Sequence, residues 1–259
     1  MKTELEILQN IARKMENLPG HVGFYYKNLT TGVTFGVRAE EAYLAASVIK
    51  FPLYLHILAE AEKGNLSLNE KLRISERDKM PGCGALKLLT GEVDVDIAAL
   101  CRLMITISDN TATNVLIRRC GMDAVNAGFR EMGLEKTVLR RYLFDAEASA
   151  RGLENTICPK EMGNLLEQLY LKSYVNQETS EAAMDTLLGQ QVCHKLEGKL
   201  CGAVDVAHKT GEDENLSNDV GLVFAKEPFI LCFAGHDTEV YPWEDRIRRA
   251  AFDLVQVQG

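Results

Sequence analysis

A serine and a lysine stand three residues apart at the start of an apolar segment, in the tetrapeptide Ser47-Val48-Ile49-Lys50. Apolar residues recur at three- and four-residue intervals over 48–62, which predicts a helix, and positions i and i+3 of a helix share a face. A serine hydroxyl needs a neighbouring base to act as a nucleophile, and a lysine supplies one where burial and nearby cations lower its pKa. Serine is also a common N-cap residue, so the tetrapeptide alone does not establish catalysis.

Pro52 falls inside this predicted helix, just after Lys50. A proline in a helix interior removes a backbone hydrogen bond, at a cost of about 3 kcal/mol. Helix propensity therefore does not explain why a proline stands there.

A second polar motif, Ser108-Asp109-Asn110, separates the helical patterns of 97–107 and 111–119. Short polar residues between two apolar helices suit a turn with an N-cap. They also suit catalysis, with Ser108 relaying a proton and Asn110 donating an amide hydrogen bond to a substrate. Alone, this motif distinguishes neither role.

A third motif, His208-Lys209-Thr210-Gly211, stands at the end of a predicted strand. Lys209 offers a cation for a substrate carboxylate, and Thr210 offers a hydroxyl. Gly211 lets a substrate approach the strand edge closely. The same residues would also suit a strand that simply runs into a turn.

Together and in this order, the motifs match S-x-x-K, S-D-N and K-T-G, the signature of class A β-lactamases and penicillin-binding proteins. The chain resembles these serine hydrolases over nearly its whole length. The resemblance implies that Ser47 is acylated by a β-lactam or a related acyl substrate, with Lys50 as general base or proton relay. Ser108 would pass the proton to the leaving nitrogen, and the backbone N–H groups of Ser47 and Glu212 would form the oxyanion hole.

The same resemblance implies roles for residues around these groups. Substrate binding is assigned to Asn110, Lys209, Thr210 and Gly211, and Asn114 matches an asparagine that braces the omega loop in the family. Asn218-Asp219 also follows the family pattern.

The omega loop is where the chain departs from the family. Class A β-lactamases carry there an E-x-x-L-N motif whose glutamate activates the deacylating water, and no such motif appears between Arg140 and Pro159. The carboxylates available are Asp145, Glu147 and Glu154, of which the first two are the candidate deacylation bases. Glu212 also stands where the family has small or hydroxyl residues, and no arginine in 212–220 reinforces Lys209.

The order of the elements predicts an α+β fold. A helix over 2–18 and strands over 22–27 and 33–37 precede a long helical block, and strands over 204–210, 219–225 and 228–234 precede a final helix over 243–256. Within the block, helical patterns cover 48–62, 97–107, 111–119, 123–131, 160–171 and 178–188.

We therefore predict an antiparallel five-stranded sheet flanked by the terminal helices, with an inserted all-helical lobe, as in β-lactamases. Residues 1–46 and 196–259 would form the sheet lobe and 47–195 the helical lobe, with the active site in the cleft between them.

Composition limits the classes of binding partner that we expect for this protein. The 259 residues are 46% hydrophobic and 25% charged, as in ordinary globular proteins, and the net charge of -8 disfavours nucleic acid or an anionic membrane as a partner. No apolar run reaches the length of about 18 residues that a transmembrane helix needs. The amphipathic start does not resemble a signal peptide, so the chain as given is expected to be cytoplasmic, with export open if a leader was removed.

The seven cysteines are an odd number without C-x-x-C spacing, which favours free thiols in a reducing compartment. Cys193 and His194 are two adjacent donors without a second pair, so we predict no metal and no cofactor. Cys83, in P-G-C-G, is expected at the rim of the cleft and inert.

Three functions remain open at this stage. The first is a β-lactamase-type hydrolase that forms an acyl-enzyme at Ser47, with slow deacylation allowed. The second is a penicillin-binding or esterase-like relative that deacylates β-lactams poorly. The third, a non-catalytic binding protein, is disfavoured because a silent site need not keep Ser47, Lys50, Ser108 and Lys209.

Overall fold

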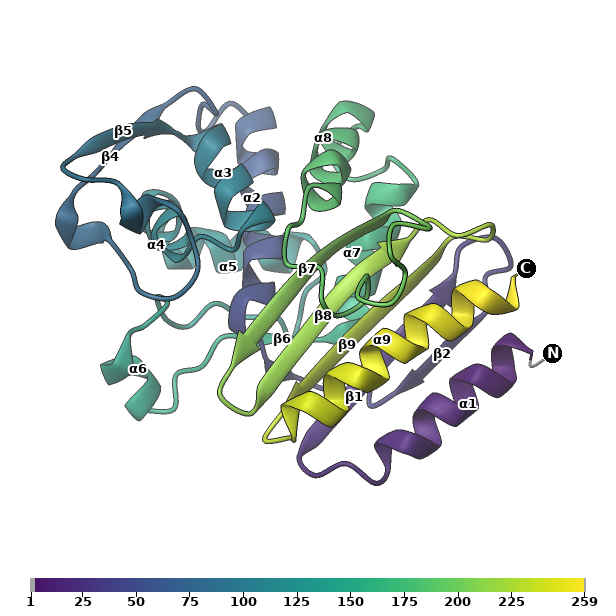
Figure 1. The fold of residues 1–259 in the computed structure, drawn as a ribbon. Coiled ribbons are helices and arrows are strands. Elements are labelled where there is room, and N and C mark those ends of the chain that lie inside the picture. The colour runs from purple at the N-terminus through teal and green to yellow at the C-terminus, as the bar shows by residue number, and fades with distance from the viewer. Residues whose placement is uncertain (1–2, 259) are drawn as a thin grey trace.

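A computed structural model describes residues 3–258 and contains a five-stranded antiparallel sheet in the order β2-β1-β9-β8-β7 (Figure 1). Its strands come from both ends of the chain, as predicted. Their bounds are β1 (His21–Asn28), β2 (Thr34–Val37), β7 (Val206–Asp213), β8 (Leu216–Val223) and β9 (Phe229–His236).

The two terminal helices, α1 (Glu4–Met15) and α9 (Val240–Val257), lie side by side on one face of this sheet (Figure 1). Each has an apolar stripe that packs on strand residues such as Phe24 and Phe233. Trp243 is fully buried there, and its indole N–H donates to the carbonyl of Ser217 at 2.7 Å. Helix α9 therefore anchors β8 from this face of the sheet.

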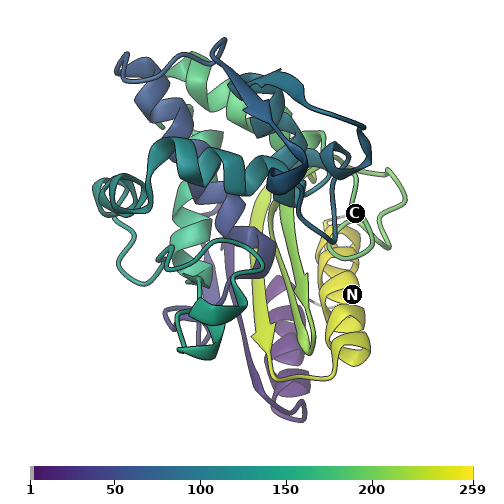
Figure 2. The ribbon, with the colours of Figure 1, turned by 90° about the vertical axis from the view of Figure 1, so that its left-hand side faces the viewer.

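The other face of the sheet is covered by the helical lobe (Figure 2). Gly163 lets one of its helices approach the sheet, since a Cβ there would come within 2.4 Å of the Tyr25 ring. The helices of the lobe are α2 (Lys50–Glu62), α3 (Ile97–Thr106), α4 (Asn110–Cys120), α5 (Met122–Glu131), α6 (Ala146–Ala150), α7 (Pro159–Tyr170) and α8 (Gln177–Leu188).

The lobe is not made of α-helices alone. It also carries two short two-stranded sheets, which the sequence analysis did not predict because each strand has at most four residues. These are β3 (Tyr43–Leu44) with β6 (Thr156–Ile157) and β4 (Lys71–Ile74) with β5 (Val93–Asp96). The short 3₁₀ helices are η1 (Ala46–Ile49), η2 (Glu76–Asp78) and η3 (Leu86–Leu88).

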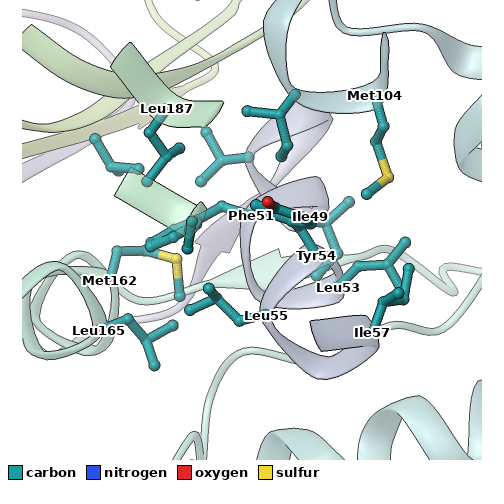
Figure 3. Close-up of a cluster of buried hydrophobic side chains, with 14 of the residues drawn as sticks. Ile49, Phe51, Leu53, Tyr54, Leu55, Ile57, Met104, Met162, Leu165 and Leu187 are labelled. Carbon is teal, nitrogen blue, oxygen red and sulfur yellow. The ribbon is translucent and has the colours of Figure 1, made fainter. Parts of the chain in front are cut away.

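Helix α2 runs through the centre of the lobe, and every residue from Lys50 to Leu58 is buried (Figure 3). Its side chains pack on those of the neighbouring helices, including Met104, Met162 and Leu187. Pro52 lies in the first turn of α2 and not in the interior that the sequence pattern indicated. The first-turn N–H groups of an α-helix lack an i−4 partner within it, so proline costs little there.

The predicted fold class and the order of its helices and sheet strands are confirmed. The division of the chain at residues 46 and 196 stays a prediction. All seven cysteines are free, although only Cys101, Cys158 and Cys232 are fully buried. No helix within residues 3–258 is long and apolar enough to cross a bilayer.

Candidate active site

Ser47 lies on the 3₁₀ turn η1 and remains partly exposed, while the helix that follows is buried. The turn begins with a strained backbone, because Ala46 has φ 41°, in the left-handed region that costs a residue with a Cβ about 1–2 kcal/mol. Asn218 of β8 donates to the carbonyls of Leu44 and Ala45 at 2.9 and 3.1 Å. The sheet thus fixes the backbone that presents the Ser47 hydroxyl.

Lys50 is fully buried one turn after Ser47. Its ammonium nitrogen donates to the Ser108 carbonyl at 2.8 Å, to Ser108 Oγ at 2.9 Å and to Asn110 Oδ1 at 2.7 Å. The first two motifs therefore meet directly, although almost sixty residues separate them in the sequence. Ser108 itself has φ 56°, which turns the chain sharply between α3 and α4.

Lys209 brings in the third motif. It is fully buried on β7, and its nitrogen donates to Ser108 Oγ at 3.1 Å and to the Thr210 carbonyl at 2.8 Å. The hydroxyl of Ser108 is thus shared by two lysines. A hydroxyl both donates and accepts, so Ser108 can carry a proton between neighbouring groups.

Burial, together with the Lys209 charge, holds the pKa of Lys50 well below its usual range. Burial, together with the charge of Lys195, lowers the pKa of Lys209 to about 7. Both shifts have the same cause, since taking an ammonium out of water beside another cation disfavours its charged form. A neutral Lys50 amine can accept the proton of a serine hydroxyl, as a general base must.

Strand β7 comes close to the turn that carries Ser47. A Cβ on Gly211 would lie 2.9 Å from the Ala45 carbonyl and 3.1 Å from the Val48 nitrogen, so only glycine permits this approach. Glu212 follows directly and lines the same cavity as Ser47. Ser47 and Glu212, whose backbone N–H groups are predicted to form the oxyanion hole, therefore line one cavity.

The Glu212 side chain is held by two cations. His194 Nε2 and Lys195 Nζ each lie 3.1 Å from Glu212 Oε1. The hydrogen bond from His194, with the Lys195 charge, lowers the pKa of Glu212 to about 2 against the opposing effect of burial. The anion that the sequence placed beside the site is thus neutralised within the protein.

The sequence analysis did not identify Lys195 as a residue of the site. It is fully buried and also donates to the carbonyls of Gly211 and Asn218, at 3.2 and 3.0 Å. No arginine stands in 212–220, but this lysine supplies a positive charge next to Lys209 from the segment before β7. A single lysine in a polar stretch carries no sequence signal for such burial.

An open cavity of about 480 Å³ joins these groups. Ser47, Asn110 and Glu212 line it, as does Cys83, which is exposed at its rim. The rest of its lining comes mainly from the loop of residues 141–155. Lys50, Ser108, Lys209 and Thr210 are buried next to this cavity and do not form its surface.

Leu143 is the loop residue that the sequence analysis missed. The Asn114 side chain donates to the Leu143 carbonyl at 3.0 Å and accepts from the Leu143 N–H at 2.9 Å. Asn114 therefore braces the loop at Leu143, and Leu143 lines the cavity with Ser47. An apolar residue therefore lines the cavity at the point where Asn114 holds the loop.

Two of the three loop carboxylates line the cavity, and both have protein partners. Asp145 lines it and accepts from the Ala148 N–H at 2.9 Å as the N-cap of α6, whereas Glu147 is exposed and does not line it. Glu154 lines it, but Arg141 binds its carboxylate at 2.8 Å and Ser149 donates to the other oxygen. Of the two candidate bases, Asp145 thus serves as a helix cap, and Glu147 is an exposed surface residue.

The fold and this cluster of serine and lysine side chains resemble those of penicillin-recognising serine hydrolases. The chain belongs to the Beta-lactamase enzyme family, whose sequence model matches residues 6–257. A β-lactamase of Rhodobacter capsulatus is 31% identical over 180 residues, which cover 68% of this chain and 61% of that enzyme. The match thus spans less than two thirds of that relative.

Solved structures extend the similarity over the whole fold. A β-lactamase from Sphaerobacter thermophilus superposes with a TM-score of 0.87 at 25% identity, covering 99% of each chain. PBP-A superposes with a TM-score of 0.88 at 26% identity, covering 97% of this chain and 95% of that one. A leucine-to-glutamate variant of PBP-A, at 26% identity and a TM-score of 0.86 over 98% and 95% of the chains, is an acyl-enzyme complex with penicillin G.

Proposed function

We propose that this protein is acylated at Ser47 by β-lactams or related acyl compounds and releases the acyl group slowly. The observation that carries the proposal is the contrast between the lysine-linked hydroxyl cluster and Leu143. Lys50 and Lys209 both reach Ser108 Oγ, whereas the loop position held by Asn114 bears no carboxylate.

Acylation would proceed with the following transfers. The Ser47 hydroxyl attacks the substrate carbonyl while its proton passes to the neutral Lys50 amine. The backbone N–H groups of Ser47 and Glu212 stabilise the developing oxyanion, a contribution worth about 10²–10³ in rate per donor. The carbon–nitrogen bond of the β-lactam then breaks, and Ser108 returns the proton to the leaving nitrogen.

Substrate binding would use the residues around this cluster. Protonated Lys209 attracts the carboxylate that β-lactams carry, with Thr210 as hydrogen-bond partner. The Asn110 side chain is already held by two hydrogen bonds, because it accepts from Lys50 and donates to the Pro81 carbonyl at 2.9 Å. It would therefore meet a substrate amide in a set orientation.

Release is the step that the loop limits. Hydrolysis of the acyl-enzyme needs a base within hydrogen-bond reach of the attacking water. Leu143 cannot serve, and the Glu154 carboxylate is ion-paired with Arg141. A penicillin-binding function with poor β-lactam turnover is therefore preferred over an efficient β-lactamase.

The test is to incubate the protein with penicillin G and follow intact mass and product together. We expect a lasting adduct of one penicillin per chain with little product, and Ser47→Ala should abolish it. Rapid turnover without an adduct would favour an efficient β-lactamase. An adduct retained in Ser47→Ala would show that another nucleophile reacts, and neither adduct nor product with several β-lactams and esters would reject acylation.

A further inference from the structure

A cysteine, a glutamate and a histidine that line no part of the cavity described above lie close together beside β7. Cys193 Sγ, a carboxylate oxygen of Glu197 and a ring nitrogen of His208 all lie within 4.8 Å of one another. Cys193 and Glu197 belong to the segment before β7, and His208 lies on the strand itself. Thiolate, carboxylate and imidazole are the side-chain ligands that zinc takes in proteins.

One ring nitrogen of His208, Nε2, has no hydrogen-bond partner among the described residues. The side chain is fully buried, and Nδ1 lies 2.9 Å from Asp219 Oδ1. Nε2 has no hydrogen-bond partner among residues 3–258, and the nearest Glu197 oxygen is 3.6 Å away. The Asp219 carboxylate on Nδ1 would orient the ring so that Nε2, once it has lost its proton, meets a cation, as in metal-binding histidines.

The spacing of the donors suits a small cation. Ligands bound tetrahedrally to zinc at about 2.0–2.3 Å lie about 3.5 Å from one another. His208 Nε2 and Glu197 are already separated by nearly this distance. The Cys193 thiol donates to the Gln190 carbonyl at 3.2 Å and would give up that contact on coordination.

The cluster is also accessible to an ion. Cys193 and Glu197 are partly exposed, whereas His208 and Asp219 are buried beneath them. A cation can therefore enter from solvent and keep one water as its fourth ligand, since three protein ligands leave that position open.

We propose that Cys193, Glu197 and His208 bind one Zn²⁺ ion, with Asp219 as the residue that positions the histidine. Binding displaces the thiol proton of Cys193 and the Nε2 proton of His208 to solvent and involves no change of oxidation state. The ion would join the segment before β7 to the strand that carries Lys209. The sequence analysis predicted no metal because Cys193 and His194 lack an adjacent second pair, whereas the fold supplies the further donors.

A neighbouring cluster of His194, Glu212 and Glu244 is the alternative location. There His194 Nε2 is already bound by Glu212 at 3.1 Å, and the buried Lys195 ammonium contacts the same carboxylate oxygen. The Lys195 ammonium already neutralises this carboxylate, and the His194 nitrogen already has a partner. Both oppose binding of a metal ion here, so the Cys193 cluster is preferred.

The test uses the whole chain, reduced and stripped of metal, titrated with zinc chloride and followed by native mass spectrometry. Cobalt chloride is the spectroscopic probe, because a cysteine thiolate on Co²⁺ gives a charge-transfer band in the near ultraviolet. We expect one ion per chain and a band that Cys193→Ser removes. Glu197→Gln should weaken zinc binding, and Cys201→Ser is the matched control, since that cysteine is exposed on the same segment and outside the cluster.

Asp219→Asn should weaken zinc binding by about 10–100-fold, as expected for loss of the group that orients a histidine ligand. A wild-type chain that binds no zinc would overturn the proposal and leave His208 as a charged partner of Asp219 and Glu197. Binding that survives Cys193→Ser and is lost in His194→Ala would overturn it too. Thermal unfolding of each metal-free variant shows whether a loss reflects misfolding, and none of these readouts requires Ser47 to react.

Discussion

On one side of the cavity, Lys50 and Lys209 are fully buried and share the Ser108 hydroxyl, whereas the loop on the other side presents Leu143 and the half-exposed Phe144. The first side rests on a 3₁₀ turn, a helix junction and a strand of the central sheet. The second rests on a loop whose carboxylates form a helix cap and an ion pair.

The difference teaches that, in the mechanism proposed above, acylation and release depend on separate parts of the fold. Every group needed to attack an acyl substrate is placed by packed elements, because a buried ammonium is tolerated only where its hydrogen bonds are satisfied. The loop is held by Asn114, but its cavity-lining carboxylates, Asp145 and Glu154, form a helix cap and an ion pair. Changes on the two sides should therefore affect different kinetic steps.

Lys50→Met should have the largest effect. Removing the general base is expected to slow acylation of Ser47 by penicillin G by about 10²–10⁴-fold. The measurement is the rate of adduct formation by intact mass, with thermal unfolding to verify that the variant folds. Acylation at the wild-type rate would assign the base to another residue.

Leu143→Glu should act on the opposite side of the comparison. A carboxylate at the position fixed by Asn114 would face the acylated serine, and hydrolysis of the adduct should accelerate by about 10²-fold. The rate of adduct loss after removal of free penicillin measures this. Leu143→Gln is the control, because it matches glutamate in shape but cannot accept the proton; equal release from both variants would refute a base at this position.

The pH dependence of acylation should report Lys209. With a pKa lowered to about 7, Lys209 is protonated below that pH and increasingly neutral above it. Acylation by a penicillin, which bears a carboxylate, should therefore fall relative to that by an uncharged ester as the pH rises through about 7. The ratio of the two acylation rates removes the contribution of Lys50, because its protonation affects both substrates alike.

Lys209→Arg provides the control for this measurement, since arginine stays charged throughout. Its ratio of the two acylation rates should not change over the same pH range. If the variant kept the wild-type dependence, the titrating group would lie elsewhere.

Asp145→Asn and Glu147→Gln should have the smallest effect. Asparagine can still cap α6, and Glu147 is exposed outside the cavity. The release rate of the penicillin adduct is expected to match that of the wild type in both variants. A slower release in either would identify a water-activating base that its position in the loop does not suggest.

The short motifs carried most of the information that the sequence held about this site. Ser47 and Ser108 lie at element boundaries that periodicity placed to within a few residues. Lys209 was expected at the end of a strand, but β7 continues to Asp213 and Lys209 lies within it. Side chains that do chemistry at element ends are readable because the elements on both sides have regular patterns.

Leu143 and Lys195 are site residues that the sequence alone does not identify. A leucine in an irregular loop has no periodic context, and only the contact from Asn114 reveals that it faces Ser47. Lys195 stands in a turn-rich segment, where a lysine is normally exposed, and is buried because three carbonyl and carboxylate oxygens converge on it. Such convergence depends on tertiary packing, which local spacing does not encode.

The close approach of Gly211 to Ala45 also bears on the last strand of the sheet. Strand β7 is the last in its sheet, and a long open edge is a template for pairing with another chain. Its residues 206–211 are buried, with the Ser47 turn packed against them, and the opposite edge, β2, is only four residues long. The turn that carries the nucleophile thus also covers buried residues of the last strand of the sheet, so that mutations loosening it should expose them and promote aggregation as well as impair the proposed acylation.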